Sequence, residues 1–165
     1  MTSSLIARFR RWFEYEQDAH QKVIASLESV PADQRSSAEF RKAVDILAHI
    51  SGARRMWLTR LGIAPPISGN PFPTDAKLAD VVEQLRAVHE LWNGYLAKLT
   101  DADLERIFEY QSLDAGRFRN RVEDILAQLY GHSWYHRGQI AMLVKRAGGV
   151  PAVTDLIYWC REPIS

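Results

Sequence analysis

Two histidines one helical turn apart, His132 and His136, are the residues of this chain whose type and spacing best suit chemistry at a metal ion. Side chains four positions apart lie on the same face of a helix. This face also carries apolar residues at steps of three or four, namely Val122, Ile125, Leu129, Ile140 and Leu143. A buried imidazole nitrogen without a partner costs roughly 1–3 kcal/mol, whereas two neutral imidazoles so spaced can bind one transition-metal ion. The pair therefore predicts a metal site on the inward face of a helix.

A third histidine, His49, lies on another predicted helix, beside the apolar residues Ile46 and Ala53. Three imidazoles from two helices can bind one side of a metal ion and leave the remaining positions open for water or substrate, as in catalytic zinc sites. A fourth protein ligand would instead indicate a structural metal. We therefore predict His49, His132 and His136 as metal ligands and assign no further catalytic residue.

The residues around these histidines exclude two familiar kinds of metal site. Ser133 follows His132, where a zinc protease of the His-Glu-x-x-His type has its glutamate. The chain also lacks the Glu-x-x-His pair that di-iron helical bundles use. One metal ion is therefore favoured over two.

Other ionisable residues fall on or beside the apolar stripes of predicted helices. Glu16 and His20 share the stripe of the first helix. They either contact a ligand and line its pocket or form a polar edge of that helix. His89 lies at the edge of another stripe and is interpreted as structural.

The residues that follow His136 are expected to support the site more than to take part in chemistry. Arg137 is predicted to pair with a carboxylate, with Asp155 as the candidate, and so to hold the carboxyl-terminal tail across the helix. Gly138 weakens the helix in its middle, so we expect a neighbouring backbone to approach closely there.

Length and composition favour one compact domain over residues 1–165. The chain is 47% hydrophobic and carries a net charge of +1, so no basic excess indicates a nucleic-acid partner. Its single cysteine excludes an internal disulfide and a cysteine-rich zinc site. Charged residues interrupt every apolar run, so we expect no membrane span and a cytoplasmic location.

Apolar periodicity predicts four long amphipathic helices over residues 3–28, 37–62, 75–100 and 121–147. Ser3 or Ser4 and Ser37 are the expected amino-terminal caps, and Asp75 is placed in the first turn of the third helix. A proline-rich crossover spans 63–74, and a short hairpin or irregular segment spans 101–120. The expected fold is all-α: a four-helix bundle with one long crossover and a short carboxyl-terminal tail with a helical turn near Asp155.

Two segments of the chain resemble the DinB-like (DinB/YfiT-like) superfamily of metal-dependent enzymes. The first places His49 eight residues before Trp57, and the second reads His132-Ser-Trp-Tyr-His136-Arg-Gly-Gln-Ile140. The tail over residues 151–158 is similar as well. The resemblance implies an up-down-down-up bundle, one divalent metal ion (zinc or nickel) on the three histidines, and a homodimer.

The same resemblance implies a small-molecule reaction. Its characterised members transfer or conjugate low-molecular-weight thiols, isomerise a small acid with a thiol cofactor, or hydrolyse. We therefore expect a mononuclear metalloenzyme, first of all a thiol transferase with the thiol as cosubstrate. The alternatives are a metal-dependent hydrolase and a non-catalytic, metal-stabilised small-molecule or stress-response binding protein. The chain carries five Trp, six Tyr and six Phe, so aromatic surface, with Trp12 and Trp92 as candidates, is expected at the homodimer interface.

Overall fold

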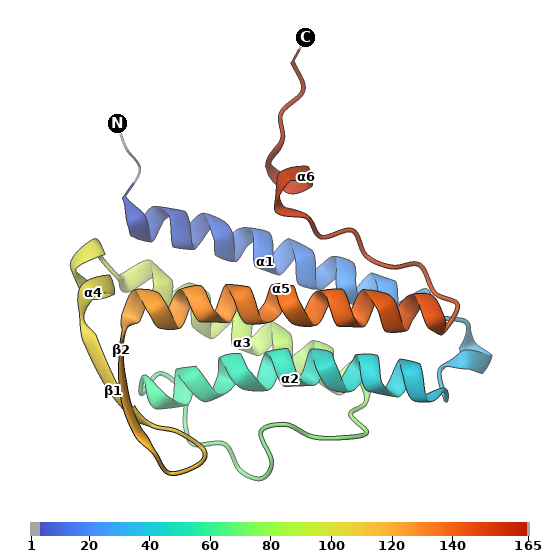
Figure 1. Ribbon diagram of the computed structural model, residues 1–165, viewed down its shortest axis with the longest axis horizontal. Coiled ribbons are helices and arrows are strands. Elements are labelled where there is room, and N and C mark those ends of the chain that lie inside the picture. Colours follow the sequence, from blue (N-terminus) through green and yellow to red (C-terminus); the bar gives the residue numbers. More distant parts are fainter. Residues whose placement is uncertain (1–3, 165) are drawn as a thin grey trace.

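Four long helices run side by side along the computed structural model, which describes residues 4–164 (Figure 1). They are α1 (Leu5–Glu28), α2 (Ala38–Arg60), α3 (Leu78–Lys98) and α5 (Val122–Arg146). Helices α1 and α5 run in one direction, and α2 and α3 run in the opposite one (Figure 1). Helix α2 packs against α5 and α3, and α1 packs against the same two helices. The prediction of a mostly helical fold is confirmed, and the directions follow the expected up-down-down-up order.

Local signals set the helix ends. The Ser4 and Ser37 hydroxyls accept hydrogen bonds from the Ala7 and Phe40 amides at 3.4 and 3.2 Å, as capping predicts. Ser3, the other candidate cap, lies outside the described residues. The third helix begins at Leu78, so the placement of Asp75 in its first turn is wrong. Asp75 has a φ of +59°, and this left-handed conformation cannot belong to a right-handed helix.

Shorter elements complete the fold between and after the long helices. A 3-10 turn, η1 (Ala32–Gln34), joins α1 to α2. The segment after α3 holds α4 (Asp101–Glu105) and the antiparallel pair β1 (Ile107–Gln111) and β2 (Arg117–Arg121). The predicted hairpin is therefore confirmed, and it adds a small sheet that the all-α class does not include. The tail carries α6 (Leu156–Cys160), which matches the expected helical turn.

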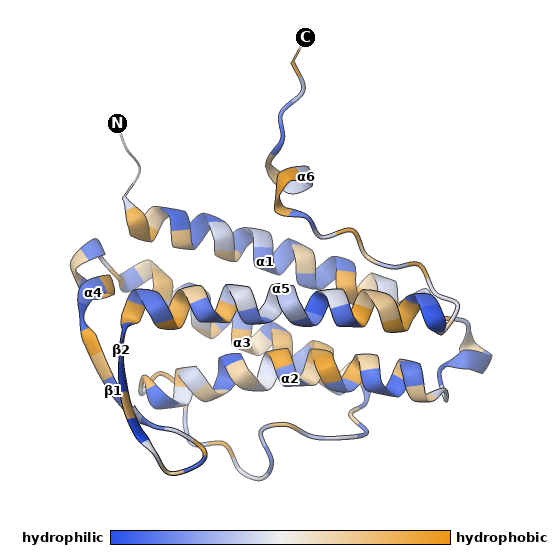
Figure 2. Cartoon of the chain, viewed as in Figure 1, coloured by the Kyte–Doolittle hydropathy of each residue, from blue (hydrophilic) through white to orange (hydrophobic). Residues whose placement is uncertain are grey.

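Two apolar clusters fill the bundle, one toward each end. The first contains Phe9, Phe13, Trp92 and Leu126, and the second contains Leu27, Leu47, Leu85 and Val144. The middle of α5 is less hydrophobic than the turns on either side of it, as its pale and blue colours show (Figure 2). A buried polar layer lies at this level, formed by Glu16, His20, Ser51, Arg54, Ser133 and Arg137. These buried polar side chains lie at the same level of the bundle as the predicted metal ligands, since Ser133 and Arg137 follow His132 and His136 directly in the chain.

The aromatic candidates for a homodimer interface differ in exposure. Trp92 is only 1% exposed and belongs to the core, so its proposed interface role is wrong. Trp12 is half-buried and packs against the core. The exposed aromatic residues include Trp134, Tyr135 and Tyr158. The homodimer itself stays a prediction. Among the helices in the described part of the chain, none is both long and apolar enough to cross a membrane.

Candidate metal centre

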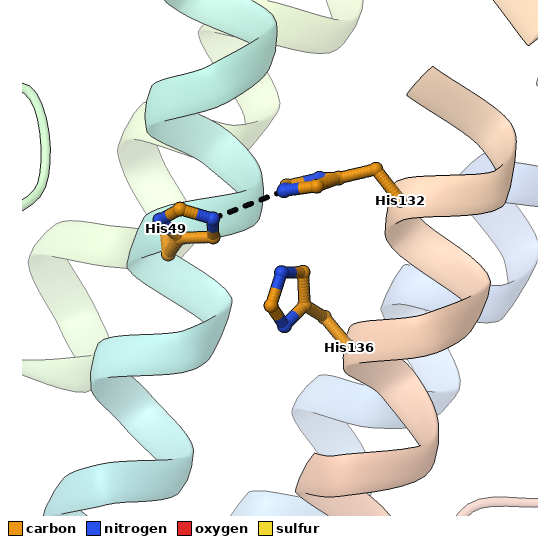
Figure 3. A group of neighbouring side chains, drawn as sticks. All are labelled: His49, His132 and His136. Atoms are coloured by element: carbon orange, nitrogen blue, oxygen red, sulfur yellow. Dashed lines mark hydrogen bonds between the residues drawn. The ribbon is translucent and has the colours of Figure 1, made fainter. Parts of the chain in front are cut away.

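His49 on α2 and His132 and His136 on α5 point toward one another between these two helices (Figure 3). One ring nitrogen from each lies within 4.8 Å of the others. The Nε2 atoms of His49 and His132 are 3.0 Å apart. Two zinc-bound nitrogens at tetrahedral angles would be separated by roughly 3.3 Å, so this spacing suits a single ion. The ring centroids of His132 and His136 are 4.4 Å apart, which follows from their positions one turn apart on α5.

Gln139 orients the third histidine. Its Oε1 lies 2.7 Å from His136 Nδ1, so that nitrogen donates a hydrogen to the amide oxygen. A neutral imidazole carries one proton, and Nε2 of His136 therefore keeps its lone pair. Partners of this kind fix the tautomer and the ring direction of metal-binding histidines. Gln139 lies three residues after His136, so a helix places it on the same side.

Burial favours the uncharged form of two of the three imidazoles, those of His49 and His132. Desolvation, followed by the nearby His136, lowers the pKa of the His49 imidazole. The same causes, with His49 and Arg54 adding to them, lower the pKa of His132 to about 4. Neutral imidazole is the form that binds a metal ion, so the environment favours the ligand state at neutral pH.

The crossover between α2 and α3 covers one side of the cluster. The Phe72 ring contacts the His49 ring, with centroids 4.7 Å apart. Nearby, a Cβ atom at Gly52 would overlap the carbonyl oxygen of Pro71. An added Cβ at Gly138 would meet no atom within 4 Å among the described residues. The expectation of a close backbone approach at Gly138 is therefore wrong, and such an approach occurs instead at Gly52 on α2, where none was predicted.

A buried ionic network stands behind the cluster. The Glu16 carboxylate accepts from Arg54 Nη2 at 2.6 Å, from Arg137 Nη1, and from Trp134 Nε1 at 3.2 Å. Arg54 also donates to Ser133 Oγ at 3.1 Å, next to His132 in the chain. Two guanidinium groups on one carboxylate satisfy the charge of a fully buried glutamate.

This network changes two expectations. Arg137 pairs with Glu16 and not with Asp155, because Arg137 points into the bundle and is only 3% exposed. Its other contact, Tyr15, donates from its hydroxyl to the Thr154 carbonyl oxygen, so the tail is still held near this point. Glu16 is fully buried, which excludes its interpretation as a polar helix edge.

His20 and His89 form a second histidine pair, away from the three predicted ligands. His20 Nδ1 lies 3.0 Å from His89 Nε2, and the two rings stack with centroids 5.2 Å apart. His20 is fully buried, so it is not a polar edge either. His89 packs edge-on against Phe13, which agrees with its structural interpretation.

Sequence reasoning missed one residue of this region, Arg54, which gives no local signal because its partner Glu16 lies on a different helix. Gln139, expected among the residues that support the site, does so through its hydrogen bond to His136. The spacing of three residues between the two could have identified this bond. The histidine cluster has three members and no carboxylate or thiolate among the described residues. A nearby cavity of about 470 Å³ touches Ser51, Gly52 and Pro71, but none of the three histidines lines it.

Comparisons with known proteins give consistent matches over most of the chain. The model of the DinB family matches residues 1–162. The protein DinB of Bacillus subtilis (strain 168) is 24% identical over 157 residues, which cover 87% of this chain and 88% of that protein. A crystal structure of a DinB-like protein from Bacillus cereus ATCC 10987 has a similar fold. It superimposes with a TM-score of 0.67 at 21% identity and covers 93% of this chain and 99% of the other.

Proposed function

The chain belongs to the DinB family, and from this premise we propose that it is a mononuclear metalloenzyme acting on small molecules. The proposal rests on the convergence of His49, His132 and His136. One ring nitrogen from each lies within 4.8 Å of the other two. Imidazole donors suit zinc and nickel, and these are the ions we propose.

The residues fit such an ion in three respects. Two members of the cluster supply neutral nitrogen donors, because burial lowers the pKa of His49 and His132. Gln139 holds the proton of His136 on Nδ1 and so leaves Nε2 free to bind. Three protein donors leave room for an exogenous ligand, which is the arrangement of catalytic sites more than of structural ones.

The ion would supply Lewis acidity, which lowers the pKa of a thiol or water that it binds. The protein's own residues position and shield it. His49, His132 and His136 would hold the ion, and the Phe72 ring covers one side of the His49 ring. No residue of the chain is assigned as general acid or base.

We propose a thiol transferase, a choice that rests on family resemblance. In this reaction a thiol sulfur forms a bond to an electrophilic carbon, the leaving group departs with its electron pair, and the thiol proton passes to solvent. The site also suits hydrolysis, in which water takes the place of the thiol.

Two measurements on protein purified without a histidine tag test the proposal. Elemental analysis should find about one zinc or nickel ion per chain. A conjugation assay with a generic aryl halide and a series of low-molecular-weight thiols should show turnover that a chelator abolishes and added metal restores. An ion without thiol turnover, but with chelator-sensitive ester cleavage, would assign the hydrolase. An ion that raises stability without either activity would assign the non-catalytic binding protein.

A further inference from the structure

A cavity of about 350 Å³ lies between α1 and α3, and the pair His20–His89 forms part of its lining. Its apolar part consists of Ile24, Val82 and Leu85. Two rim residues, Arg86 and Glu90, pair with each other at 3.6 Å. The side-chain amides of Gln17, Gln21 and Asn93 complete the lining beside the two histidines. An apolar patch surrounded by polar groups, in a cavity of this size, can hold a small molecule.

The buried side of the pair determines where its protons lie. His20 Nε2 has no hydrogen-bond partner and stands 3.7 Å from Glu16 Oε2. A bare lone pair there would face a carboxylate oxygen and be repelled, whereas an N–H group is attracted. The proton of His20 is therefore on Nε2, and its Nδ1 accepts the hydrogen bond that His89 Nε2 donates.

This tautomer leaves His89 Nδ1 as a lone-pair acceptor. Among the described residues, His89 Nδ1 has no hydrogen-bond partner. It is also absent from the fully buried atoms that lack a partner, so part of its surface is exposed. His89 is one of the residues that line the cavity, so we take this Nδ1 atom as the acceptor that a bound molecule would contact. Burial, with the charge of Arg54 adding to it, lowers the pKa of His89 to about 3, so the ring stays uncharged at neutral pH.

We propose that this cavity is a second binding site, for a small uncharged molecule in which an apolar ring carries one O–H or N–H donor. The donor binds His89 Nδ1, and the ring packs against Ile24, Val82 and Leu85. A carboxylate oxygen at His89 Nδ1 would face a lone pair and be repelled, and the positive charge of Arg54, which acts on both histidines, disfavours a cation beside them. This site is independent of the proposed metal function, because it uses α1 and α3 and none of the three proposed ligands.

Phenol and its methyl ether, anisole, are matched probes for this site. Each is titrated into the full chain while the imidazole resonances are followed by proton–nitrogen NMR, with metal present and with a chelator. We expect phenol to shift the signals of His20 and His89 saturably in both conditions. Anisole lacks the donor and should bind about tenfold more weakly, the value of one hydrogen bond. Equal affinity for the two probes, or no saturable shift of these signals, would overturn the proposal.

Substitutions locate the binding. Val82→Trp fills the cavity from α3, and Gln21→Trp does so from an exposed position on α1, where the fold is less at risk. Both should abolish the phenol response. Ala87→Trp adds the same side chain to α3, but Ala87 lines the cavity of about 470 Å³ described above and not this one. It should therefore leave the phenol response unchanged. Retention of phenol binding in folded Gln21→Trp and Val82→Trp would place the site elsewhere.

Discussion

His49 and His132 bring two ring nitrogens to 3.0 Å, and His20 and His89 bring two to the same distance. The first pair is half-buried and has a third imidazole, that of His136, beside it. The second is stacked in the core, next to the carboxylate of Glu16. The separation of two histidines therefore does not identify a metal site. The third imidazole, which only the first pair has, distinguishes the two.

The largest expected effect comes from removing the negative charge of Glu16, which lies beside the pair His20–His89. Glu16→Gln leaves Arg54 and Arg137 buried without their counter-ion, and it should lower the free energy of unfolding by about 3–5 kcal/mol. Urea denaturation of the metal-free protein measures this change. The control is Glu83→Gln, which breaks only an exposed pair with Arg86 and should leave stability nearly unchanged. A Glu16→Gln protein as stable as the parent would show that the two arginines do not need this charge.

The next effect separates the two histidine groups by metal affinity. His136→Ala removes one of three proposed donors, so zinc or nickel affinity should fall about 100-fold or more. His89→Ala removes a residue that contacts His20 instead, and affinity should stay within about threefold. Calorimetric titration of both variants makes the measurement. Similar losses in both would mean that the ligand set is misassigned.

A smaller effect concerns the residue that orients His136. Gln139→Ala loses the acceptor for His136 Nδ1 and should weaken metal affinity about 10–100-fold. Gln139→Glu keeps an acceptor at the same position and should restore the affinity of the parent. If both variants bind the metal ion equally weakly, Gln139 does not act through its hydrogen bond to His136.

The smallest effect is a change of folding stability with pH. It compares His132 of the first histidine group with His89 of the second, in the metal-free protein. His132 and His89 have pKa values lowered from 6.5 to about 4 and about 3. The folded state therefore binds fewer protons than the unfolded state below pH 6.5, and stability is full above that pH and falls as acid is added. His89→Gln should remove up to about 1.4 kcal/mol per pH unit of this slope down to about pH 3, and His132→Gln only down to about pH 4.

Urea denaturation at a series of pH values, in the presence of a chelator, measures these slopes. A control at pH 8 removes the titration and isolates the loss of packing in each variant. A His89→Gln curve that runs parallel to the parent below pH 6.5 would contradict the assigned role of burial and Arg54.

Features encoded within one helix were predictable from the sequence, and features formed between helices were not. Apolar spacing gave the long helices, and the spacing of four residues gave His132 and His136 as a pair. The pairing of Glu16 with Arg54 and Arg137 depends on how α1, α2 and α5 meet, which no local pattern records. The same holds for Gly52, whose role appears only when the crossover lies against α2. Helix α4 did have a local signal, the capping box of Thr100 and Asp103, and it was overlooked.

The contact of Pro71 with Gly52 also determines how the crossover can change in length. Loops on protein surfaces usually accept insertions, because closing a somewhat longer loop costs little entropy. Here the loop contacts α2 at internal points. The Pro65 carbonyl oxygen accepts from Arg55 and Thr59, and Pro71 lies against Gly52, beside the ring of Phe72 that touches His49. Extra residues at Ser68 would enlarge the exposed arc between these contacts, whereas extra residues between Pro71 and Phe72 would shift the ring away from the histidines. The crossover thus contains an arc that can vary in length and a segment whose register is tied to the site.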